Sequence, residues 1–288
     1  MQNQAYQRIT DRIVATMEQG RIPWRKPWKG RKCLPRNFVS SKEYRGINVF
    51  LLLAMDYESP LWLTMRQVNK LGGNVRKGER ACPVVFWKRI KVDEKEGEKT
   101  RHIPILRYYH VFNVSQCVGL PGLGEDPGDE AVIPGPEEIV TKMPERPPIK
   151  HGMDKAFYAP MLDLVGMPDR GVFERIEDYY STLFHELTHS TGHPKRLNRP
   201  SVAEHSEYGT DPYCKEELVA EMGAAFLCGS AGIVDRTIDN SAAYLSNWLE
   251  RLRSDAALVV QAASQAQKAA DFILGQSWDE TPEPEVVP

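Results

Sequence analysis

The chain has 288 residues, of which 41% are hydrophobic and 26% charged, as is typical of a soluble globular protein long enough for two domains. No apolar run approaches the ~18 residues of a membrane span, so neither a membrane protein nor a membrane partner is expected. The net charge of −2 is the sum of two opposite halves: residues 1–120 contain 23 Lys and Arg and 10 Asp and Glu, whereas residues 121–288 contain 14 and 29. This division predicts a basic module with a polyanionic partner, joined to an acidic module with another task.

The basic module is predicted to begin with helices. Apolar residues at helical spacing indicate a helix over residues 3–19, which Gly20 ends. Two more helices are predicted at 48–57 and 64–72, and Thr64 is expected to be the N-cap of the second.

The pattern then changes to that of strands and a linker. Residues 81–92 and 102–114 are rich in β-branched and aromatic side chains and flank a charged turn, which predicts a β-hairpin. Pro, Gly and acidic residues crowd together in residues 121–150, which predicts a linker. Each module is therefore expected to fold on its own.

The acidic module is predicted to mix short strands with helices. Strands are expected at 155–160 and 163–168, helices at 176–192, 214–232 and about 241–274, and a disordered tail at 279–288. The predicted fold class is α+β with two domains: helices plus a β-hairpin or sheet in residues 1–120, and a helix-rich domain in residues 151–288.

Two further features concern the cellular compartment. The first 20 residues lack the basic and apolar blocks of a signal peptide, so a cytoplasmic location is expected. The five cysteines form no CxxC pair, which argues against a disulfide framework and against a cysteine zinc site.

The sequence FHELTHSTGH, residues 184–193, has the spacing of a metal site. On a helix, His185 and His189 share one face and can direct both imidazoles at one ion, while Glu186 stands beside them as a base for a bound water. Burying these polar groups in an apolar helix is costly unless a metal compensates for it. We therefore predict one divalent ion, zinc first and manganese or another divalent ion as alternatives.

A third ligand is expected from the next helix. Glu217 and Glu221 lie four residues apart on one face, and Glu217 is preferred as the ligand, with Glu221 orienting a metal-binding imidazole. Glu216 points about 100° away and is expected to face solvent. His193 is the rival third ligand. In the alternative interpretation, Glu217 and Glu221 lie on a solvent-exposed face of the helix and bind no metal.

A peptidase must also hold an extended substrate and stabilise an oxyanion. Residues 163–168 are a candidate for the strand that pairs with the substrate at a sheet edge. Tyr208 and Tyr213 are candidate oxyanion donors, although a core position is the more common one for a tyrosine.

The segment of residues 21–45 contains nine Lys or Arg and a single acid, with aromatic residues between them. Basic groups neutralise phosphates and exposed aromatic rings stack on unpaired bases, so this composition predicts binding to single-stranded DNA without sequence preference. Trp24 and Trp28 are the predicted stacking residues. The predicted contacts are Arg21, Trp24, Arg25, Lys26, Trp28, Lys29, Arg31, Lys32, Arg36 and Arg45.

These segments together resemble the ArdC antirestriction proteins of conjugative plasmids and the N-terminal region of TraC-type primases. The motifs that carry the resemblance are PWRKPW, YRGINVFLL, KGERACPVVFWK, HVFNVSQC, FYAP, HELTHSTGHPKRLNR and KEELVAEMGAAFL.

The resemblance implies a domain that binds single-stranded DNA, a zincin-like metallopeptidase domain of the HExxH type, and protection of incoming plasmid DNA from host restriction during conjugation. By motif, His185 and His189 match the metal histidines and Glu186 the general base. EELVAEMGAA resembles the second metal helix of ImmA/IrrE-type peptidases, which also favours Glu217, although that family often has Asn at the position of Glu221.

Two functions remain open at this point. In the first, the protein binds single-stranded DNA and cleaves a protein substrate that the sequence does not identify; a component of host restriction is one candidate. In the second, it is a DNA-binding shield or interaction protein whose peptidase-like domain is a non-cleaving scaffold. A metal-dependent nuclease is disfavoured, because such sites use oxygen-rich ligand sets.

Overall fold

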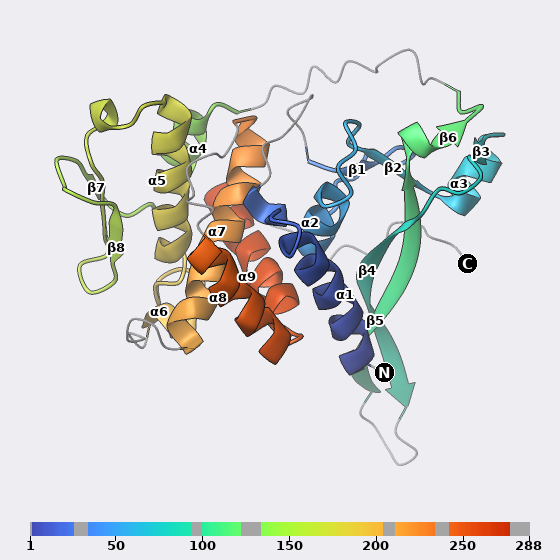
Figure 1. Cartoon of the computed structure of the whole chain (residues 1–288). Coiled ribbons are helices and arrows are strands. Elements are labelled where there is room, and N and C mark those ends of the chain that lie inside the picture. Colours follow the sequence, from blue (N-terminus) through green and yellow to red (C-terminus); the bar gives the residue numbers. More distant parts are fainter. Residues whose placement is uncertain are drawn as a thin grey trace.

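The structure, a computed structural model, describes residues 2–25, 34–93, 100–121, 134–203, 211–233 and 242–276. Figure 1 shows the long strands β4 and β5 on one side of the molecule and the C-terminal helices on the other, with α1 and α2 between them. The N-terminal elements are α1 (Gln2–Met17), η1 (Pro23–Arg25), β1 (Arg36–Asn37), α2 (Ile47–Leu53), β2 (Leu61–Thr64), α3 (Met65–Lys70), β3 (Asn74–Val75), β4 (Cys82–Asp93), β5 (Thr100–Asn113), η2 (Val114–Gln116) and β6 (Cys117–Val118). The C-terminal elements are α4 (Pro136–Lys142), β7 (Ile149–Lys150), β8 (Phe157–Ala159), β9 (Leu164–Gly166), η3 (Arg170–Val172), α5 (Ile176–Ser190), α6 (Pro200–Ala203), α7 (Asp211–Ala231), α8 (Ala242–Ser254) and α9 (Leu258–Ile273). The predicted α+β class is confirmed.

The N-terminal half is built on the predicted hairpin. Strands β4 and β5 pair antiparallel from Cys82–Val111 to Asp93–Thr100, within a sheet of order β1-β2-β5-β4. The Thr64 side chain accepts a hydrogen bond from the Gln67 amide at 3.2 Å and so caps α3, as predicted. Helix α3 covers a small core that includes Leu63 and Val68.

The C-terminal half has a three-stranded sheet of order β7-β9-β8 that packs against α5. Because β9 is the central strand, the expectation that residues 163–168 form a free edge is wrong. Strand β7, which lies in the predicted linker, pairs with β9 and occupies that edge. Strand β8 is the opposite edge strand of this sheet, and it packs against α5.

Helix α7 is buried on nearly all sides, between α5 and α9. At Gly223, α7 packs close to α5, and a Cβ atom there would lie 2.5 Å from Cγ2 of Thr188. Glycine is therefore required at this crossing for the two helices to pack at this distance. Within the described residues, no helix is long and apolar enough to cross a bilayer.

Two predicted segments differ from the structure. Residues 122–133 of the predicted linker lie outside the described residues. The rest of it belongs to the C-terminal domain, because Ile139 and Val140 of α4 are buried there and β7 pairs with β9. The single helix predicted over 241–274 is two helices. The carboxylate of Asp255 accepts a hydrogen bond from the Ala257 amide at 2.9 Å, in a turn that separates α8 from α9.

The two halves share one continuous hydrophobic core. Phe50 of α2 stacks on Phe226 of α7 with a centroid distance of 4.8 Å. The hydroxyl of Thr10 donates to the Ala256 carbonyl at 2.7 Å, and Arg45 forms an ion pair with Asp271. Because apolar residues of both halves fill the same core, we expect their folding to be coupled. The independent folding of the two modules stays a prediction that separate expression tests.

Candidate metal centre and nucleic-acid interface

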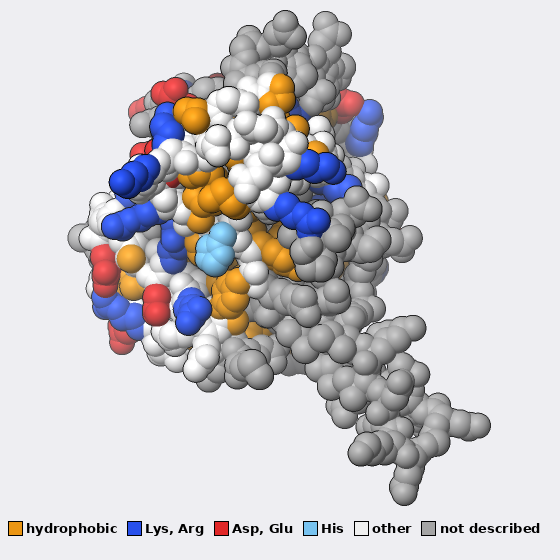
Figure 2. Space-filling model, turned by 90° about the vertical axis from the view of Figure 1, so that its right-hand side faces the viewer, with side chains coloured by type: hydrophobic (Ala, Val, Ile, Leu, Met, Phe, Trp, Pro, Cys, Tyr) orange, Lys and Arg blue, Asp and Glu red, His pale blue; other side chains and the backbone are white. Residues whose placement is uncertain are grey.

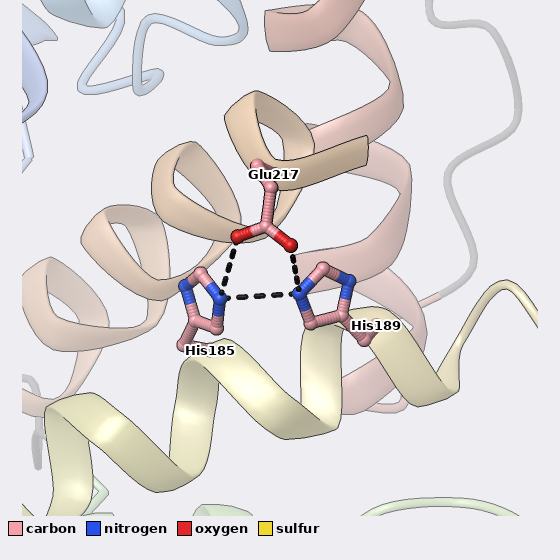
Figure 3. A group of neighbouring side chains, drawn as sticks. All are labelled: His185, His189 and Glu217. Carbon is pink, nitrogen blue, oxygen red and sulfur yellow. Dashed lines mark hydrogen bonds and ion pairs between the residues drawn. The ribbon is translucent and has the colours of Figure 1, made fainter. Parts of the chain in front are cut away.

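Helix α5 presents two imidazoles one turn apart. The Nε2 atoms of His185 and His189 are 3.1 Å from each other, and their rings meet edge to face with centroids 4.7 Å apart. The spacing of four residues places both side chains on one helix face, as the sequence predicts. Figure 3 shows both rings directed toward α7.

Helix α7 completes the group with Glu217 (Figure 3). One carboxylate oxygen lies 3.5 Å from Nε2 of His185, and the other lies 3.6 Å from Nε2 of His189. One ligand atom from each of these three residues lies within 4.8 Å of the other two. Two imidazole nitrogens and one carboxylate oxygen are a donor set that suits a catalytic divalent ion, so the residues present fit a metal.

The electrostatics of the group favour a cation. Although burial disfavours the imidazolium form of His185, the hydrogen bond that its imidazole donates to Glu217 and the charges of Glu186, Glu217 and Glu221 raise its pKa to about 9. Burial likewise opposes ionisation of Glu217, but the two histidines and a hydrogen bond from Tyr213 lower the pKa of its carboxyl to about 2. Positive charge is therefore stabilised at the point where the three side chains meet.

Three other predicted residues lie around this group. Glu186 follows His185 on α5 and is buried. Glu221 is also buried, one turn after Glu217, and its carboxylate accepts a hydrogen bond from the indole of Trp24 at 2.9 Å. Tyr213 lies one turn before Glu217 and hydrogen bonds to it.

Glu216 is not solvent-facing, which corrects the expectation from helix geometry. Its side chain is 5% exposed, and Oε1 lies 3.4 Å from Nδ1 of His189. Arg199 covers this side of α7 and donates to both carboxylate oxygens, at 2.5 and 3.0 Å. Burial opposes ionisation, but the hydrogen bonds from His189 and Arg199 lower the pKa of Glu216 to about 2. The signal available in the sequence was Arg199, the last residue of HPKRLNR, which could have indicated a partner for a buried carboxylate.

The rival metal ligand lies elsewhere. Nδ1 of His193 is 4.0 Å from a carboxylate oxygen of Asp163, and His193 is not among the residues that converge with His185 and His189. Tyr208 lies outside the described residues.

Trp24 is not a surface platform for bases, in contrast to the prediction. Its side chain is 2% exposed, contacts Phe50 edge to face with a centroid distance of 6.2 Å, and donates to Glu221. The flanking prolines and charges suggested exposure, but η1 turns the indole toward α7. In this conformation the ring faces are covered by protein and offer no stacking surface to a base.

The other predicted DNA-binding residues fall into two groups. Arg21 is exposed and pairs with Asp56 at 3.8 Å, Arg36 is half-buried in β1, and Arg45 pairs with Asp271. The remaining side chains lie outside the described part of the chain: Arg25, Lys26, Trp28, Lys29, Arg31 and Lys32.

A different basic surface is visible in the described residues. Figure 2 shows the side of the molecule on which α3, β3 and β6 lie, where Lys and Arg side chains surround hydrophobic ones. Met65 and Val118 are 44% and 48% exposed. We call this the α3 face, and its exposed basic residues are Lys42, Arg66, Lys70, Arg76, Lys77 and Arg80.

Two family models match the chain. Residues 3–112 match the N-terminal domain of the anti-restriction factor ArdC, and residues 137–265 match a zincin-like metallopeptidase. The second match begins inside the predicted linker, in agreement with the position of α4 in the structure.

Solved structures and relatives give the same picture. The metal-free crystal structure of the antirestriction protein ArdC from plasmid R388 is 38% identical, with a TM-score of 0.75, and the match covers 93% of this chain and 96% of that one. The Mn(II)-bound structure of the same protein is 37% identical, with a TM-score of 0.73 and coverage of 94% and 97%. An uncharacterised protein, y4eC, of Sinorhizobium fredii is 35% identical over 95% of this chain and 92% of its own length. The DNA primase TraC of Escherichia coli is 32% identical over 93% of this chain, which spans 27% of the primase.

Proposed function

Because the chain belongs to the ArdC family of antirestriction proteins, with a zincin-like domain and a divalent metal site, we propose that it joins single-stranded DNA binding to metal-dependent peptide hydrolysis. The proposed setting is the protection of incoming plasmid DNA from host restriction during conjugation. The observation that carries the peptidase half is the convergence of His185, His189 and Glu217, with Glu186 beside them.

The proposed roles follow from the position of each side chain. A divalent ion held by the three ligands would polarise a peptide carbonyl and acidify a water molecule. Glu186, which is not needed as a ligand, is the residue on α5 that can accept the proton of the attacking water. Tyr213, held close to the ligand Glu217, is the candidate donor to the developing oxyanion.

The substrate is proposed to bind as an extended peptide beside the metal centre. Strand β8 is an edge of the sheet and lies against α5, so its free backbone groups can pair with an added strand. The substrate itself is a protein that the residues of the site do not identify, and a component of host restriction is the candidate from the proposed setting.

Zinc is the proposed ion, with manganese as the alternative. Two imidazoles and one carboxylate are the ligand set of many catalytic zinc sites. The relative from plasmid R388 has been crystallised with Mn(II), which supports a divalent ion and makes manganese the alternative.

Single-stranded DNA is proposed to bind the N-terminal domain. The α3 face supports this proposal, because it combines exposed lysines and arginines with exposed apolar side chains. The burial of Trp24 removes one of the two aromatic residues predicted for the 21–45 segment, so the basic residues of the α3 face take a larger share of the proposed contact.

The scaffold alternative is favoured by one observation, the core shared by the two halves. A domain so closely packed against the DNA-binding half can stabilise it without cleaving anything. Both functions require a folded metal domain, and only the peptidase requires Glu186.

Glu186→Gln in the full chain therefore tests the proposal, with Glu177→Gln, on the same helix, as the matched control. We expect Glu186→Gln to keep its metal and to lose protection of plasmid DNA transferred into a restriction-proficient host, while Glu177→Gln keeps both. If Glu186→Gln keeps metal and still protects the DNA, the peptidase is not what protects it and the scaffold function replaces the proposal.

A further inference from the structure

A buried ion pair lies directly behind one of the proposed metal ligands. Glu216 and Arg199 are each 5% exposed, and the guanidinium donates to both carboxylate oxygens. Ser201 adds a hydrogen bond to Oε2 at 2.6 Å. Oε1 also lies 3.4 Å from Nδ1 of His189.

Arg199 is fixed by the same helix that carries His189. It donates to the carbonyl of Thr188 at 2.8 Å and to the hydroxyl of Thr191 at 2.6 Å, both at the C-terminal end of α5. Its own amide donates to the Gly192 carbonyl at 3.0 Å. The carboxylate of Glu216 is thus tied to the end of α5, next to the imidazole that it contacts.

We infer that Glu216 is a positioning residue of the metal centre. Arg199 holds the Glu216 carboxylate in place, and this carboxylate fixes the tautomer and the ring orientation of His189. An ionised carboxylate only accepts hydrogen bonds, so it favours the tautomer of His189 with the proton on Nδ1. The lone pair of Nε2 then faces His185 and Glu217, where the ion is proposed to bind. A carboxylate on Nδ1 also makes the imidazole a stronger metal ligand. The inference rests on the proposed function, since it takes His189 as a ligand.

A merely structural role of the Glu216–Arg199 pair would be to stabilise the C-terminal end of α5 through the hydrogen bonds of Arg199. The chain offers a control for that role in a second carboxylate–arginine pair near the same helix end. Arg196 donates to the two oxygens of Asp163 at 2.8 and 3.0 Å, and its side chain is 2% exposed. This pair contacts His193, which is outside the proposed ligand set.

The test compares Glu216→Gln with Asp163→Asn in the full chain. With its NH₂ group at the position of Oε1, an amide at residue 216 removes the acceptor of Nδ1–H of His189. With its NH₂ group at the position of Oε2, it keeps only a neutral, weaker acceptor for His189 and faces the N–H of Arg199 that the carboxylate accepts from. Affinity for Zn(II) and Co(II) would be measured by chelator competition, and the coordination geometry by the visible absorption spectrum of bound Co(II). We expect Glu216→Gln to bind both ions about 10–100-fold more weakly and to change the Co(II) spectrum, and Asp163→Asn to bind as the wild type does.

Equal affinity of Glu216→Gln and the wild type would overturn the inference, and so would an equal loss in Asp163→Asn, because the effect would then belong to the helix end. If Glu216→Gln does not fold, the double variant Glu216→Gln/Arg199→Gln removes both buried charges and is measured in the same way. A wild type that binds neither ion would instead contradict the proposed function.

Discussion

Trp24→Phe separates the buried role of this indole from the DNA-binding role that the sequence suggests. The substitution keeps an aromatic ring against Phe50 but removes the N–H that donates to the buried carboxylate of Glu221 at 2.9 Å. A hydrogen bond to a charged group contributes about 1.5–3 kcal/mol. The smaller ring also leaves a cavity, so we expect the free energy of unfolding to fall by about 2–4 kcal/mol.

The assay has two readouts on the same protein. Urea denaturation followed by far-UV circular dichroism gives the free energy of unfolding, and titration with a fluorescent oligonucleotide gives the affinity for single-stranded DNA. Trp62→Phe is the matched control, because Trp62 is equally buried, at 2% exposure, but lies on β2.

The expected result for Trp24→Phe is a loss of stability larger than that of Trp62→Phe, with the DNA affinity of the folded protein unchanged. A base-stacking role predicts the reverse: unchanged stability and a loss of about 1–3 kcal/mol in DNA binding. That outcome would refute the argument from burial.

Three further results are expected. Fragments 1–121 and 134–288, expressed separately so that α4 stays with the C-terminal half, should show broad and less cooperative unfolding because each exposes its side of the shared core; two sharply unfolding fragments as stable as the full chain would contradict this. Gly223→Ala should cost about 1–3 kcal/mol in the free energy of unfolding, because its Cβ would meet Thr188 at 2.5 Å, and Thr188→Ala should recover part of the loss in the double variant. Removing one basic contact of the α3 face, as in Lys70→Ala, should lower the slope of log affinity against log salt by ~0.7 for single-stranded DNA, and an unchanged slope would move the DNA site elsewhere.

The sequence predicted those parts that depend on local patterns. The β-branched and aromatic residues of 81–92 and 102–114, on either side of a charged turn, are enough to predict a hairpin, and the N-cap at Thr64 follows from local sequence. The positions of His185 and His189 follow from helix geometry alone, and the structure brings Glu217 to them from the next long helix.

What sequence reasoning missed depends on packing partners far along the chain. Helix geometry correctly points Glu216 away from Glu217, but it does not reveal that Arg199 covers that side of α7. The indole of Trp24 is buried against α7, where it donates to Glu221, 197 residues later in the chain. The break between α8 and α9 has no Gly or Pro to mark it, because a single Asp255 side chain stabilises the turn.

Metal analysis of the full chain shows directly whether His185, His189 and Glu217 hold one divalent ion. Protein purified without chelator, and again after loading with Zn(II) or Mn(II), would be compared with Glu217→Ala treated in the same way. We expect one equivalent of divalent ion in the wild type and a large loss of bound ion in Glu217→Ala. Wild-type protein that stays empty after loading, or Glu217→Ala that retains as much ion as the wild type, would contradict this expectation.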